Sequence, residues 1–312
     1  MVKRLWAVIA LVAIVALVGC EAAPVERAAA PGGPGDRQVA EVERFDPLTS
    51  RVRVPDVAGL HRTEHATSAE QERILLSDLS LAGETTLVEI VVRPRGHGRP
   101  SGEATEPVNG QPAYWVDGSS AARRNPGVRL AFTWADDSWA YVGAATSPGV
   151  PTTHDVLRSL ARQVAEAIEF TAPARVPLPF TVAADLGGLR GRFEPTGTHR
   201  MWSLRIPPGE PAVRASLQLT DPDRGPRHGS LSIAAESDGE HSYKPGTGNT
   251  VVDGRRAYDS GSGTIVVFEH ADGFTVEVTG PGEADLLALA AAVTVIDGAA
   301  DEASWTDDYL LS

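Results

Sequence analysis

The sequence is short of cysteine, lysine and net positive charge. Its 312 residues include one cysteine, Cys20, and the formal net charge is −13. A single cysteine excludes a disulfide within the chain, so the folded part must be held together by its hydrophobic core even in an oxidising compartment. An acidic chain is repelled by phosphate backbones and by anionic head groups, which argues against nucleic acid as a partner and predicts that any membrane attachment comes from a lipid.

The first twenty residues have the pattern of an export signal. Lys3 and Arg4 precede an uncharged run of fifteen residues, Leu5 to Gly19. A membrane-spanning helix needs about 20 apolar residues, whereas the core of a signal peptide needs roughly 7 to 15. The run therefore predicts export rather than permanent insertion.

The residues that end this run predict a lipid anchor. Leu17-Val18-Gly19-Cys20 resembles the lipobox of bacterial lipoproteins. The resemblance implies a signal peptide over residues 1–19, S-diacylglycerylation of Cys20, an acylated new amino terminus, and a place on the outer face of the cell membrane. Two or three acyl chains anchor a protein stably where one does not. The alternative interpretation of Cys20 is a buried free thiol.

After the cysteine the composition changes. Residues 20–50 are rich in Ala, Pro, Gly and charge, including Ala29-Ala-Pro-Gly-Gly-Pro-Gly35. Such a segment is typical of a flexible tether with a reach of about 30 Å. The folded part is expected to begin near Arg51.

The remainder contains one pattern twice. Pro55–Leu60 (PDVAGL) recurs as Ala184–Leu189 (ADLGGL), and positions 55 and 184 differ by 129. Val108–Tyr114 (VNGQPAY) recurs as Val252–Tyr258 (VDGRRAY), and positions 108 and 252 differ by 144. Landmarks repeated in the same order at a domain-sized spacing predict a duplication, not a solenoid.

Each copy alternates apolar and polar residues and then ends in an apolar stripe with helical spacing. Strict alternation is typical of antiparallel strands with one wet face. The sequence therefore predicts an α+β fold of two tandem modules, each a twisted antiparallel sheet with a C-terminal helix packed on one face. The expected parts are a first module over residues 51–172, a Pro-rich join over 173–179, a second module over 180–297, and an acidic tail over 298–312.

One short motif raises the question of a metal site. His61-Arg-Thr-Glu64-His65 fits the H-x-x-E-H pattern of inverzincin metallopeptidases, which places both histidines and the glutamate on one helix. The segment is instead expected to be an exposed edge strand. In an extended chain His61 and His65 would point the same way from positions about 13 Å apart and could not close on one ion.

Other features are each compatible with a structural role or a binding role. Ser260-Gly-Ser-Gly263 is expected to be a turn, because it lacks the Lys-Thr ending of a phosphate loop. Trp305 to Leu311 in the tail either folds back on the protein or forms a recognition segment. Aromatic residues gather in the first module and either pack the sheet or form a ligand or partner surface; they are Tyr114, Trp115, Trp134, Trp139 and Tyr141.

The repeated motifs resemble a known kind of envelope domain. The V-x-G-x-x-A-Y pattern, an apolar hairpin with aromatics around an acidic turn, and Asp before Leu-Leu or Val-Leu in an Ala-rich helix are similar to a domain of unknown function in bacterial envelope proteins. Some of these are linked to anti-sigma regulation and are distantly similar to lipoprotein-carrier half-barrels. The resemblance implies a binding or sensing module and supplies no catalytic residue.

Together these observations predict a non-enzymatic, membrane-anchored lipoprotein without a cofactor or metal. Its expected partners are the membrane, through the anchor on Cys20, and an envelope protein, an envelope polymer or a small hydrophobic ligand. The alternative is a lipid-anchored, metal-dependent hydrolase that uses His61, Glu64 and His65.

Overall fold

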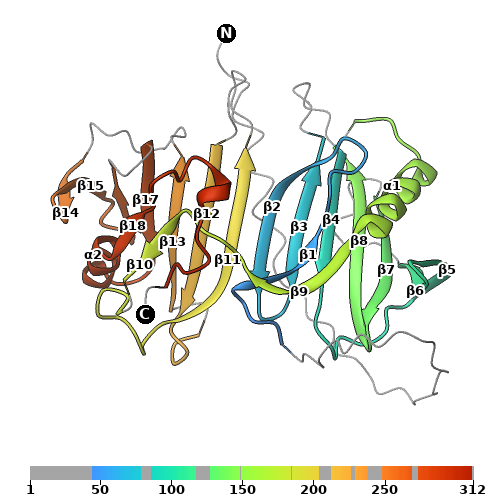
Figure 1. The fold of residues 1–312 in the computed structure, drawn as a ribbon, viewed down its shortest axis with the longest axis horizontal. Helices are drawn as coiled ribbons and strands as arrows, with labels where there is room; N and C mark the ends of the chain where they lie inside the picture. Colours follow the sequence, from blue (N-terminus) through green and yellow to red (C-terminus); the bar gives the residue numbers. More distant parts are fainter. Residues whose placement is uncertain are drawn as a thin grey trace, which may run out of the picture.

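A computed structural model describes residues 44–78, 86–116, 127–147, 149–183, 185–203, 212–225, 229–237, 248–268 and 273–310. Its main feature is one antiparallel sheet of fourteen strands that runs across the molecule (Figure 1). The strand order is β14-β15-β16-β17-β13-β12-β11-β2-β3-β4-β8-β7-β6-β5. Every strand pair in this sheet is antiparallel.

The first half of the chain builds one side of the sheet. From the centre outward its strands are β2 (His61–Ser68), β3 (Glu72–Ser77), β4 (Thr86–Val92), β8 (Ser138–Thr146), β7 (Gly127–Ala135), β6 (Gln111–Val116) and β5 (Gly102–Val108).

The second half builds the other side in the same order. From the centre outward its strands are β11 (Glu194–Ser203), β12 (Ala212–Thr220), β13 (Ser230–Ser237), β17 (Phe274–Thr279), β16 (Thr264–Val267), β15 (Arg255–Asp259) and β14 (Thr250–Val252). The two halves therefore have the same connectivity and meet at the β2–β11 pair.

Short elements cover one face of the sheet. Each half adds a two-stranded ribbon and a helix, and the C-terminal segment adds a 3-10 turn (Figure 1). The ribbons are β1 (Thr49–Arg53) with β9 (Glu169–Arg175) and β10 (Phe180–Val182) with β18 (Val293–Val295); the helices are α1 (His154–Ala167), α2 (Glu283–Ala291) and η5 (Glu302–Ser304).

Helix α1 forms where the sequence supplies a cap and an apolar stripe. The Thr153 side chain accepts a hydrogen bond from the Val156 amide, and Asp155 lies in the first turn, where negative charge is favourable. The buried face of the helix packs on β7 and β8. It consists of Leu157, Ala161, Val164 and Ala165.

Two hydrophobic cores lie under the helices. One joins α1 to the inner side chains of β3, β4, β7 and β8, and the other joins α2 to those of β12, β13, β16 and β17. Strand register places both cores on the same face: Ile74 of one core lies opposite His65, His65 opposite Arg200, and Arg200 opposite Ala215 of the other core. We call this the covered face and the other the open face.

The predicted α+β class is wrong. Strands account for 55% of the structure and helices for 11%, and the strands form one continuous sheet instead of two separate ones. The alternation along each half identified strands but did not indicate what pairs with the innermost sheet strand of each half, β2 or β11. In the structure these two strands pair with each other, which removes an exposed edge from both halves.

Several segments assigned to linkers belong to the cores. Phe45 and Leu48, in the predicted tether, are buried, as are Val176 and Leu178 in the predicted join. In the acidic tail, Trp305 and Tyr309 are buried as well, so this segment folds back on the protein. The Trp305 indole donates to the carbonyl of Ala299.

The β2–β11 pair depends on a glycine. Gly197 lies opposite Ser68, and a Cβ at this position would be 2.3 Å from the Thr67 carbonyl oxygen, an overlap that backbone in a ladder cannot relieve. Gly197→Ala is expected to lower the free energy of unfolding by about 2 kcal/mol in urea denaturation. Gly143→Ala is the control, because its nearest contact would be a carbonyl oxygen at 3.7 Å. Equal effects of the two substitutions would refute this account of the junction.

Candidate functional site

The HRTEH motif forms strand β2, as expected, but not the exposed edge strand that was predicted: β2 lies between β3 and β11, Glu64 and His65 are buried, and the strand contains a bulge. Its register against β3 shifts between Arg62 and Glu64. As a result His61 and Glu64 face the open side, whereas His65 faces the covered side with Ile74. The prediction that both histidines point the same way is therefore wrong, because the bulge inserts one extra residue and reverses the alternation.

His65 lies in a buried polar network at the junction of the halves. Its Nε2 is 2.9 Å from Glu72 Oε1, and its Nδ1 is 2.5 Å from an Arg200 guanidinium nitrogen. Since an arginine nitrogen only donates, Nδ1 accepts and Nε2–H donates to Glu72. Glu72 also accepts from the Ser50 hydroxyl at 2.5 Å and from the Arg51 amide at 2.8 Å. The network thus ties β1, β2, β3 and β11 together.

Burial controls the protonation of this network. Burial lowers the pKa of His65, and the nearby charge of Arg200 lowers it further against the opposing effect of Glu72. Burial also lowers the pKa of Arg200 to about 10, with the like charge of Arg62 adding to the effect. A neutral histidine between a carboxylate and a guanidinium is a bridge that holds strands together; with both ring nitrogens occupied, it has no free nitrogen with which to act as a base.

A second charged cluster lies on the open face directly behind the first. Glu64 accepts from Arg73 at 2.6 Å and contacts His199 at 3.0 Å, and Arg73 also binds Glu89 at 2.7 Å. Burial alone would raise the pKa of Glu64, but hydrogen bonds and charge from His199 and Arg73 hold it below its usual value. The network crosses β4, β3, β2 and β11, so it also spans the junction.

These positions bear on the metal-site alternative. Glu64 and His65 project from opposite faces of β2, so they do not converge on one ion. Across the ranges that the structure describes, no group of three His, Cys, Asp or Glu side chains could hold a metal. An inverzincin site also needs a glutamate from elsewhere in the chain as third ligand; Glu89 of β4 is bound to Arg73, and Glu84 lies outside the described residues.

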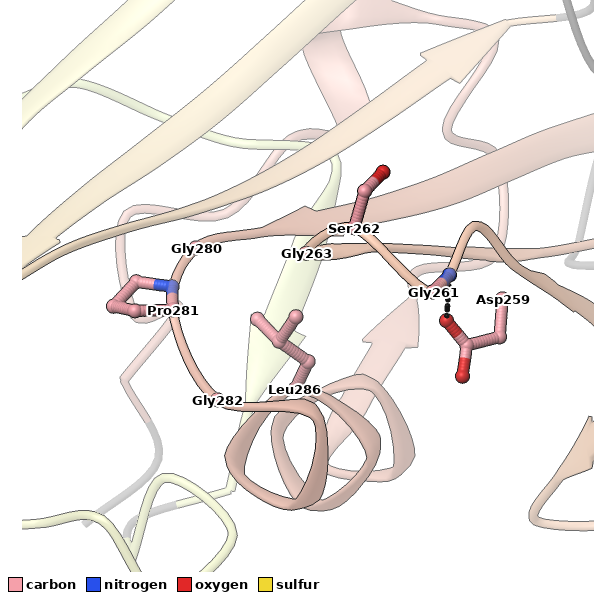
Figure 2. A pocket seen from close by; sticks show the side chains of 8 residues that line it. All are labelled: Asp259, Gly261, Ser262, Gly263, Gly280, Pro281, Gly282 and Leu286. Atoms are coloured by element: carbon pink, nitrogen blue, oxygen red, sulfur yellow. Dashed lines mark hydrogen bonds between the residues drawn. The ribbon is translucent and has the colours of Figure 1, made fainter.

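The Gly-rich turn lines a small pocket. Ser260–Gly263 connects β15 to β16, as expected for a turn, and faces Gly280–Gly282 at the start of α2 (Figure 2). The pocket has a volume of about 230 Å³, with Leu286 as its apolar wall and Asp259 accepting from the Gly261 amide (Figure 2). Ligand pockets for drug-sized molecules usually reach about 300–1,000 Å³, so this one is small.

The aromatic residues of the first half divide between the two faces. Trp115 and Trp134 pack against the covered core, whereas Tyr114, Trp139 and Tyr141 belong to the open face. Three arginines accompany the second group. The Cζ atoms of Arg93 and Arg129 lie 5.7 and 4.8 Å from the centre of the Tyr141 ring, and that of Arg99 lies 4.5 Å from Tyr114. We call these six residues the arginine-aromatic patch.

The partners in these clusters were not identified from the sequence. Arg73 lies in β3, and His199 and Arg200 are neighbours in β11. The sequence shows that these strands carry charged side chains, but it does not show which face of the sheet each side chain occupies. The RPRGHGRP segment, residues 93–100, carries three arginines but was not singled out from the sequence. Its connection with Tyr114 and Tyr141 depends on strand pairing that connects residues far apart in the sequence.

Comparisons with known proteins find no match: no family model, no curated protein and no solved structure is similar to this chain. Cys20 and its lipobox lie outside the described residues. Among the helices in the described ranges, none has the length and apolar character needed to cross a bilayer.

Proposed function

We propose that this protein is a lipid-anchored, extracytoplasmic binding module that presents the open face of its sheet to a partner, without catalysing a reaction. The observation that carries the proposal is the joining of two half-sheets into one through β2 and β11. Fourteen strands spaced by about 4.8 Å give a wall about 60 Å wide. A wall of that size suits a large partner surface.

Polar side chains at the junction make this wall suitable for recognition. The Glu89-Arg73-Glu64-His199 network crosses the β2–β11 pair on the open face, and the buried Glu72-His65-Arg200 network supports the same pair from the covered face. Such networks fix side chains in one arrangement and so preorganise a surface for binding.

Two observations favour a large partner over a small hydrophobic ligand. The spaces between sheet and helices are filled by the two cores, and the pocket beside α2 is small and lined largely by glycine. The hydrolase alternative gains no support, because its three residues are divided between two faces. An envelope protein, an envelope polymer or the membrane surface remains as the partner class.

The anchor is tested by making the protein in a bacterial host that processes lipoproteins. The wild type should enter the detergent phase on Triton X-114 partitioning, and its intact mass should correspond to a chain that begins at an acylated Cys20. Cys20→Ser should lose the acyl mass and keep its signal peptide. A wild-type protein found in the aqueous phase with its initiator methionine would contradict the proposal.

A further inference from the structure

The arginine-aromatic patch is a continuous surface. Strand register places Tyr114 opposite Ala131 and Ala131 opposite Tyr141, so the two tyrosines lie in one row across β6, β7 and β8. The ring of Trp139 meets that of Tyr114 edge-on at 5.9 Å. Arg93 continues β4 past its last residue, with its amide bound to the Trp139 carbonyl. Arg99 donates to the Tyr114 hydroxyl at 2.5 Å.

The arginines of the patch are available to an anion. Within the described part of the chain, Arg93, Arg99 and Arg129 form no ion pair with a carboxylate, and their guanidinium groups stack on tyrosine rings instead. Burial lowers the pKa of Arg129, the charge of Glu89 opposes this, and the charge of Arg93 adds to it; burial and Arg93 also lower the pKa of His97. The patch is a local concentration of positive charge on a protein with a net charge of −13.

A buried donor in the patch also lacks an acceptor. Trp139 is 4% exposed, and its indole N–H has no hydrogen-bond partner among the described residues. A buried polar group without a partner is costly, and it is usually satisfied by water or a ligand. The indole N–H itself is buried, so the surface that a head group meets consists of cations and ring faces, a composition that suits anionic head groups at a membrane interface.

The chain enters the fold on the covered face, near the Arg93 end of this patch. Phe45, at the start of the described chain, packs against the Trp134 ring at a centroid distance of 6.1 Å, and the Trp134 indole donates to the Arg93 carbonyl at 3.0 Å. Positions 20 and 44 are 24 residues apart. A flexible segment of that length has a root-mean-square span of about 27 Å. An acylated Cys20 would thus keep the folded body within reach of the bilayer, and the patch would decide which surface of the body faces it.

We infer that the arginine-aromatic patch binds the anionic phospholipid head groups of the membrane that carries the anchor, and so sets the orientation of the tethered body. This inference rests on the proposed function. The net negative charge does not prevent the contact, because at physiological salt charges beyond about 8 Å from the surface are largely screened. Tethering compensates for weak affinity, since it makes the contact intramolecular.

Nearby carboxylates limit the strength of the contact. Asp136 and Asp137 are exposed in the turn between β7 and β8, which is adjacent to Trp139. Each arginine near an anionic surface contributes about a five-fold increase in the bound population. Asp136→Asn/Asp137→Asn should strengthen the contact, whereas Arg93→Gln/Arg99→Gln should weaken it about 25-fold.

The test uses the full acylated protein in vesicles of phosphatidylcholine alone or with about 30% phosphatidylglycerol, a composition chosen to supply roughly the charge of an anionic leaflet. Amide hydrogen exchange of residues 93–101 should be slower in the anionic vesicles, and high salt should abolish the difference. Arg93→Gln/Arg99→Gln should lose the protection. Arg190→Gln, which removes an exposed arginine from the second half, should keep it.

The outcomes separate this inference from the proposal on which it rests. Protein that fails to float with either kind of vesicle would overturn the anchor and the inference together. Protein that floats but exchanges equally in both vesicles would overturn only the inference. Protection by inorganic phosphate without vesicles, at the level seen with anionic vesicles, would also overturn it and would assign the patch to a soluble anion.

Discussion

Glu72→Gln is expected to lower the free energy of unfolding by about 3 kcal/mol, because the substitution breaks a fully buried charged network. Glu72 accepts hydrogen bonds from Ser50, Arg51 and His65 and is only 2% exposed. A glutamine amide has only one acceptor oxygen, so either the Arg51 amide or the Ser50 and His65 donors lose their acceptor, and the buried Arg200 loses one of its two nearby carboxylates and keeps Glu302. Urea denaturation followed by tryptophan fluorescence measures the loss.

Two further variants test whether the loss of stability comes from the buried hydrogen-bonded network around Glu72. Glu89→Gln removes a carboxylate that is 38% exposed and bonded to Arg73, and it should cost less than about 1 kcal/mol. Arg200→Met added to Glu72→Gln should recover part of the loss, since it removes a buried cation that has lost one of its two nearby carboxylates. Additive effects in the double variant would contradict coupling through His65.

The sequence predicts local structure here better than it predicts assembly. The alternation in Phe274–Thr279 and the apolar stripe of α1 are readable because their periods of two and 3.6 residues reflect a single buried face. The pairing of β2 with β11 is not readable, because nothing in either strand specifies its neighbour. Gly197 marks the close approach of the two backbones, but a glycine within a strand equally marks a bulge or a bend.

In the candidate sites, too, the local structure could be predicted from the sequence but the contacts between distant residues could not. HRTEH was identified as a strand, but the bulge at Thr63 that sends Glu64 and His65 to opposite faces depends on the pairing with β3. Charged residues within a strand indicate that something must satisfy them, yet their partners come from elsewhere in the chain: Arg200 lies 135 positions from His65. The aromatic cluster was visible, and only the register shows that Trp139 and Trp134 belong to different faces.

The stability of the protein is expected to fall as the pH drops below about 6.5, and His65 should be a major cause. Burial lowers the pKa of His65 in the folded protein, while in the unfolded chain it stays near 6.5. Below that pH, His65 binds a proton in the unfolded state but stays neutral in the folded state. The free energy of unfolding therefore decreases by up to about 1.4 kcal/mol per pH unit until the pKa of His65 in the folded state is reached. Above about pH 7 this contribution has no pH dependence.

His65→Gln isolates this effect, because its amide can accept from Arg200 and donate to Glu72 without titrating. The variant should show a smaller decline in stability between about pH 7 and pH 5 than the wild type, whatever its stability in mildly alkaline buffer. His61→Gln, at an exposed position of the same strand, should keep the wild-type decline. If the free energy of unfolding declined equally with pH in the wild type and in His65→Gln over this range, protonation of His65 would not be the cause of the decline.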